Sequence, residues 1–244
     1  MKSNSETGHA KNVANFEDLI SFCTGYGSTY DPSKNAFKLV ALNAQFSDAQ
    51  ISISKVTIAK NAFDIATGNR QTAFEPLRKL STKIINALSA TDALETVVKD
   101  AKTINRKLQG SRASKTNTTN TQTNTTEESA KTISTSQQSY DRLMDSFDKL
   151  INLVSAEPLY APNEAELKTA NLSTTLAQLQ TLNIEVIAKY TVYSNARIDR
   201  DNLLYAPNTG LLDTAFDVKK YVKSIFGASS PQYKQVSSLK FSRT

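Results

Sequence analysis

The chain has 244 residues, of which 39% are hydrophobic and 21% charged, and its 29 basic and 23 acidic side chains give a formal charge of +6. Seven glycines and six prolines leave few turns, which argues against a sandwich or barrel of many short strands. A single cysteine excludes an internal disulfide framework, and no apolar run reaches the ~20 residues that a membrane-spanning helix needs.

The N-terminal residues 1–12 are polar and contain the only histidine, His9. We expect this segment to be flexible. It lacks the apolar core of a secretory signal, so we expect a cytoplasmic location, with non-classical export left open.

Apolar residues recur at helical spacing through the first half of the chain. An entry helix containing Phe16 leads to a corner at residues 30–32, and a long helix follows, with an interruption expected near Gly68 or Pro76. A final helix before residue 110 carries one apolar stripe, made of Val97, Ala101, Ile104 and Leu108.

The ends of that final helix have their own signals. Ser89 or Thr91 is expected to cap its start, because a hydroxyl can accept a bond from a free backbone N–H. Gly110 follows as the expected stop. Basic side chains occupy the other faces of this helix.

Residues 110–139 consist largely of threonine, asparagine, glutamine and serine, with almost nothing apolar. Such a tract cannot bury enough surface to offset the entropy lost on ordering. We therefore expect a flexible linker between two helical regions.

The second half repeats the helical pattern. One stripe consists of Leu172, Leu176, Leu179 and Leu182, continued by Val186, Tyr190 and Tyr193. Another consists of Val218, Tyr221, Val222, Ile225 and Phe226, and ends at Gly227. Ser230 followed by Pro231 predicts a capped start for a last short helix.

The stretch LYAPN occurs at 159–163 and again at 204–208, and a related YDP stands at 30–32. Proline disfavours helix in the residue before it, so each element is expected to end one helix and start the next. Asn163 and Asn208 are the predicted caps, the former supported by Glu166 three residues on.

The tyrosines of these elements are expected to pack their rings against the helix ends, with their hydroxyls at the surface. The alternative is that they form a recognition surface for a ligand or partner. The residues concerned are Tyr30, Tyr160 and Tyr205.

The two halves match each other in collinear order. Tyr30 aligns with Tyr160, and the prolines that follow them also align. We interpret residues 13–109 and 140–241 as divergent copies of one multi-helix unit. The alternative is that any two amphipathic helical segments can be brought into register; the aligned prolines argue against it. The expected fold is all-α, with antiparallel helical bundles that either stack or merge.

Few residues suggest catalysis or metal binding. His9 stands alone, so histidine triads and histidine-rich metal sites are not expected. Cys23 has no identifiable base and is interpreted as a small packing residue. No phosphate-binding loop, dinucleotide fingerprint or calcium loop occurs. We expect no catalytic, cofactor or metal residues and no cofactor.

A basic segment at residues 99–115 is the candidate for anion or nucleic-acid contact. Its cations are Lys99, Lys102, Arg106, Lys107, Arg112 and Lys115. They could engage phosphates, but no stacking aromatics are interleaved with them. Cations near a helix C-terminus are also stabilised by the helix dipole alone.

These observations favour a non-enzymatic structural or protein-interaction scaffold that binds a protein partner or its own copies. The alternative is a nucleic-acid-associated protein, which salt-dependent retention on DNA would distinguish. A membrane-active helical protein is less favoured, since no apolar hairpin of about 20 residues exists. An enzyme is the least favoured.

Overall fold

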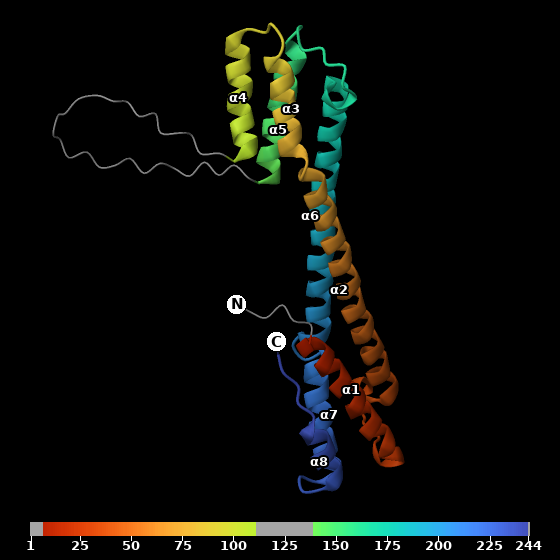
Figure 1. The fold of residues 1–244 in the computed structure, drawn as a ribbon. Helices are drawn as coiled ribbons and strands as arrows, with labels where there is room; N and C mark the ends of the chain where they lie inside the picture. The colour runs from red at the N-terminus through yellow and green to blue at the C-terminus, as the bar shows by residue number, and fades with distance from the viewer. Residues whose placement is uncertain (1–6, 111–138, 244) are drawn as a thin grey trace, which may run out of the picture. The chain divides into compact units, whose positions relative to one another are not determined.

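The computed structural model describes residues 7–110 and 139–243 (Figure 1). Helices and turns make up this part of the chain, which contains no strand, so the prediction of an all-α protein is confirmed. The α-helices are α1 (Thr7–Gly25), α2 (Leu39–Phe74), α3 (Leu77–Ser89), α4 (Glu95–Gln109), α5 (Tyr140–Ala156), α6 (Thr169–Tyr205), α7 (Leu211–Phe226) and α8 (Pro231–Ser238). Short 3-10 helices are η1 (Gly27–Thr29), η2 (Asn35–Phe37) and η3 (Ala165–Leu167).

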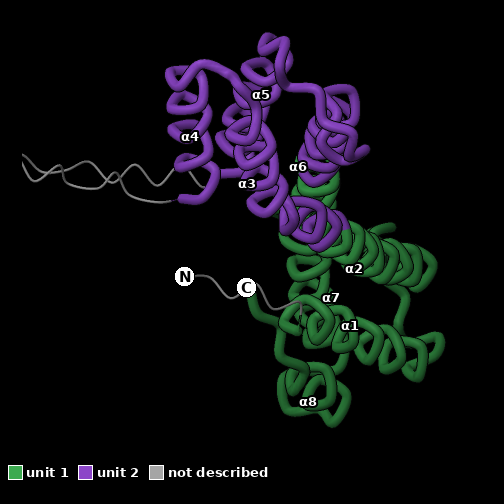
Figure 2. Tube along the Cα trace, turned by 45° about the horizontal axis from the view of Figure 1, so that its top comes forward, with its two compact units in different colours: residues 1–65, 187–244 green, residues 66–186 purple. Residues whose placement is uncertain are grey.

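The chain forms two compact units, coloured separately in Figure 2. Unit 1 combines Met1–Ile65 with Ile187–Thr244, and unit 2 is Ala66–Val186. The long helices α2 and α6 each contribute residues to both units.

Unit 1 is built on α1, α7 and α8, which pack against one another. Its core includes side chains from all three helices, among them Phe16, Leu19, Val218, Val222 and Val236. These residues lie on single apolar stripes, and burial of each stripe against the next removes their surface from water.

Unit 2 is built on α3, α4 and α5, which also pack against one another. Its core includes Ile84, Leu88, Leu108, Phe147 and Leu150, each of them buried. Leu108 belongs to the stripe predicted for the helix before the linker, and that stripe faces this core.

Each unit takes helices from both sides of the linker. Unit 1 joins α1 to α7 and α8, whereas unit 2 joins α5 to α3 and α4. The compact units therefore do not follow the predicted copies at 13–109 and 140–241, because the entry helix of one copy buries its stripe against the last helices of the other. The predicted linker at 110–139 lies almost wholly outside the described residues.

Of the N-terminal segment predicted to be flexible, residues 1–6 lie outside the described residues, whereas residues 7–12 are helical. Helix α1 already begins at Thr7, and His9 and Asn12 are buried within it. Asn12 donates from Nδ2 to the backbone carbonyl of Ser242 at 2.8 Å and accepts from that residue's N–H at 3.1 Å. These bonds tie the start of α1 to the C-terminal segment, which sequence periodicity cannot reveal.

Several predicted helix ends are confirmed. Ser230 caps α8 by accepting a bond from the Tyr233 N–H, with Pro231 at the start of the helix. Gly110 ends α4 in the left-handed conformation at φ 72°. Helix α2 runs through Gly68 without interruption and ends before Pro76.

Other predicted caps are wrong. Thr91 binds the Leu88 carbonyl and the Ala93 N–H, so it closes the turn after α3 instead of capping α4. Asn163 caps nothing, because η3 begins after Glu164 and α6 only at Thr169.

Asn208 also fails as a predicted cap. It adopts a left-handed φ of 66°, and Gly210 takes the capping position of α7. Short polar side chains satisfy turns as well as helix starts, so the sequence does not distinguish the two uses.

Candidate interaction surface

The corner tyrosines use their hydroxyls inside the protein. Tyr30 donates to the Phe37 carbonyl at 2.8 Å, and Tyr160 donates to the Leu167 carbonyl at 3.0 Å. Both rings are buried, so the expectation of surface hydroxyls is wrong. The pKa of Tyr160 is raised to about 12, mainly because the side chain is buried and to a smaller extent because the negative charge of Glu164 is nearby. These hydroxyls hold the corners closed.

Tyr205 lies at the end of α6 and contacts α1. Its hydroxyl is 2.7 Å from His9 Nδ1 and accepts a bond from Asn12 Nδ2 at 3.2 Å. The His9 and Tyr205 rings are tilted at 53° with centroids 5.6 Å apart. This cluster anchors the first turns of α1 in unit 1.

The basic segment lies on α4, where its described cations are exposed. Lys99 forms an ion pair with Glu95 at 2.9 Å, and Arg106 donates to the Thr103 hydroxyl at 3.2 Å. Arg106 and Lys107 occupy the last turn, where cations complement the helix dipole.

Two further cations of the predicted segment, Arg112 and Lys115, lie outside the described residues. Lys102 is exposed on α4.

Cys23 is fully buried in the core of unit 1. Burial raises the pKa of its thiol to about 12, only partly offset by a side-chain hydrogen bond with Tyr30. The thiol therefore keeps its proton at neutral pH, which removes the thiolate that nucleophilic attack requires. Across residues 7–110 and 139–243, no group of histidine, cysteine or acidic side chains is arranged to hold a metal ion.

The same described ranges hold no helix with the length and apolar character needed to cross a membrane.

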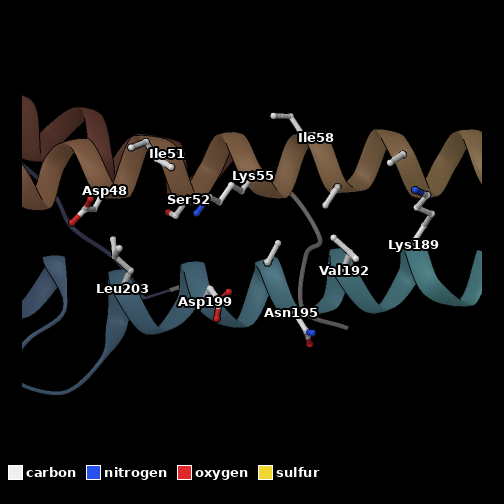
Figure 3. A pocket seen from close by; sticks show the side chains of 13 residues that line it. Asp48, Ile51, Ser52, Lys55, Ile58, Lys189, Val192, Asn195, Asp199 and Leu203 are labelled. Carbon is white, nitrogen blue, oxygen red and sulfur yellow. The ribbon is translucent and has the colours of Figure 1, made fainter.

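A groove runs between α2 and α6 within unit 1 (Figure 3). The helices are antiparallel here, as the residue labels of Figure 3 show, and the groove has a volume of about 650 Å³. Alanines contribute to its lining, namely Ala59, Ala62 and Ala196. Because the alanine side chain is only a methyl group, these three positions leave space between α2 and α6 that a larger side chain would fill.

Large apolar side chains around the groove are exposed to solvent. Ile51 is 50% exposed, Ile58 66% and Val192 57%. Ile65, seven residues after Ile58 on α2, is 64% exposed. Ile51, Ile58 and Ile65 recur every seven residues, the spacing that places side chains along one seam of a helix.

Charged side chains border the same groove. Asp48 and Lys55 come from α2, and Lys189 and Asp199 come from α6. In Figure 3 Asp48 lies toward the Leu203 end and Lys189 toward the opposite end, with the Lys55 nitrogen and Asp199 at about the same level between them. The groove thus has an apolar middle and a rim of both signs.

Aromatic contacts join α2 and α6 in this unit. The Phe63 ring lies 5.5 Å from the Tyr190 ring and stacks on Tyr193 at 6.1 Å, centroid to centroid. The guanidinium of Arg197 lies 5.6 Å from the Tyr193 ring centroid. These contacts hold the helices that border the groove.

Sequence reasoning missed this surface. The signal was present as isoleucine at every seventh position from Ile51 to Ile65. It was hidden because α2 also carries an inward stripe, and apolar residues on two faces of a helix do not reveal which face is covered.

No protein-family model, curated protein or solved structure matches this chain.

Proposed function

We propose that this chain is a non-enzymatic protein-interaction scaffold, and that the groove between α2 and α6 is its binding surface. The exposed isoleucines carry the proposal. Exposed apolar patches with polar rims mark interaction sites. Full burial of one such side chain against a partner contributes about 1.5–3 kcal/mol to the free energy of binding.

The shape and pattern of the groove favour a helical partner. It lies along two antiparallel helices, and Ile51, Ile58 and Ile65 follow a seven-residue repeat on α2. Helices bind such surfaces by inserting apolar side chains between those of the receiving helices. The lysines and aspartates at the rim of the groove would pair with opposite charges on the partner and so fix the direction in which it binds.

Site-specific photo-crosslinking tests the proposal. A photo-reactive amino acid replaces Ile58 in the full chain, expressed in the cells that naturally contain it. The matched control carries the same amino acid at Asn69, which is exposed on the same helix but outside the groove. We expect protein adducts at position 58 and few at position 69. Equal yields at the two positions, or none at position 58, would contradict the proposed function.

A further inference from the structure

The charges bordering the groove between α2 and α6 differ in sign at its two ends. In Figure 3, Asp48 lies at one end of the groove, the Lys55 nitrogen and Asp199 lie at about the same level further along, and Lys189 lies at the other end. One end is acidic, the other is basic, and the four formal charges cancel. The exposed apolar side chains of Ile51, Ile58 and Val192 accompany them.

We propose that the occupant of this groove is the same groove on a second copy of the chain, in an antiparallel two-fold contact. The inference rests on the proposed function, because it requires the groove to be a protein-binding surface. A two-fold contact brings one patch against itself in reverse. Reversal places the acidic end of each copy against the basic end of the other, so the rim is complementary to itself.

The apolar middle of the groove suits the same arrangement. A helix pair packed on a helix pair gives a four-helix contact, which accommodates isoleucines at seven-residue spacing. Ile58, at 66% exposure, would be covered by the second copy together with Ile51 and Val192.

A second copy also fits the charge balance better than a highly charged helix does. A strongly basic helix would meet Lys189 at one end of the groove, and a strongly acidic helix would meet Asp48 at the other. The whole chain carries +6, so two copies repel each other in general. A locally neutral face with ends of opposite sign is where that repulsion is relieved.

Paired charge reversals test the contact in the full chain. The variant Asp48→Lys/Asp199→Lys leaves only positive rim charges, and Lys55→Glu/Lys189→Glu leaves only negative ones. We expect the wild type to dimerise from its 26.8 kDa monomer in sedimentation velocity and native mass spectrometry. Each variant alone should dissociate at least about 10-fold more readily, because close like charges cost about 1.4 kcal/mol or more.

The decisive sample is an equimolar mixture of the two variants. It should form a heterodimer, because opposite rims now face each other. Asp100→Lys and Lys102→Glu make similar changes on exposed α4 positions and should leave the wild-type dimer unchanged. A monomeric wild type, or a dimer that survives both reversals, would overturn the inference.

The two proposals fail separately. If the wild type is monomeric while position 58 still crosslinks to a different protein, the groove binds a partner but not its own copy. If position 58 gives no protein adduct at all, the interaction function itself is overturned.

Discussion

The hydroxyls of Tyr30 and Tyr160 each reach a carbonyl seven residues further along the chain. Phe37 ends η2 and Leu167 ends η3, so both bonds close a corner just before a long helix. The tyrosine-proline motif alone predicted that the chain would turn here. It could not predict where the hydroxyl points, because that depends on backbone placed by the turn itself.

Two glycines give opposite predictions for the same substitution. Gly68 is exposed in the middle of α2, and a Cβ there would have nothing within 4 Å. Gly68→Ala should raise the free energy of unfolding by about 0.5–1 kcal/mol, because glycine disfavours helix.

Gly210 is the matched counterpart. A Cβ there would lie 2.6 Å from the Ala206 nitrogen and 2.7 Å from its carbonyl oxygen. Gly210→Ala should lower the free energy of unfolding by about 1–3 kcal/mol, since rigid backbone must shift. Urea titration of both variants checks the pair, and equal effects of one sign would refute the reasoning.

Because of Cys23 and Tyr160, the free energy of unfolding should change with pH in the alkaline range. Burial raises the pKa of Cys23 from 9.0 to about 12, and that of Tyr160 from 10.0 to about 12. The folded state holds these protons more tightly than the unfolded state does. The stability that they contribute is therefore complete below pH 9 and is lost as the pH rises toward about 12.

The variant Cys23→Ala, which lacks the thiol, should show how much of the loss of stability at alkaline pH is due to Cys23. Between pH 9 and 10 the free energy of unfolding should fall less steeply in Cys23→Ala than in the wild type, because the tyrosines ionise later in the unfolded chain. Urea unfolding at several pH values provides the measurement. Parallel slopes in the two proteins would show that the thiol is not the cause.

At the scale of elements, periodicity identified the helices well. The stripe that includes Leu108 faces a core as predicted, and so does the one that includes Val218. The ends were harder to predict. Gly110 and Ser230 act as expected, whereas Thr91 and Asn208 serve turns, because a short polar side chain can satisfy either kind of backbone group.

The groove between α2 and α6 was not foreseen for a related reason. Periodicity locates the apolar faces of a helix but not the neighbours that cover them. On α2, Val56 is buried whereas Ile58 is 66% exposed, although both are β-branched and apolar. The packing of neighbouring helices decides which of the two is covered, and periodicity does not give it.

At the scale of the whole molecule, the exchange of helices across the linker is the main feature that sequence reasoning could not supply. The stripes of α1 and α5 require an apolar partner, and the helices before or after the linker could each provide one. In the structure α1 packs on α7 and α8, and α5 packs on α3 and α4. Both units therefore combine one helix from one side of the linker with two from the other, and internal duplication stays a prediction.

The exchange predicts that the linker can be cut without separating the two halves. After cleavage at a protease site inserted within residues 111–138, both fragments should stay bound, because each unit buries helices from both sides of the cut. Size-exclusion chromatography and native mass spectrometry should give the uncut mass of about 26.8 kDa per complete set of fragments. The cleaved protein in denaturant, where the fragments must separate, is the control. If the halves separate under native conditions, the packing of α1 on α7 and α8 is not what holds unit 1 together.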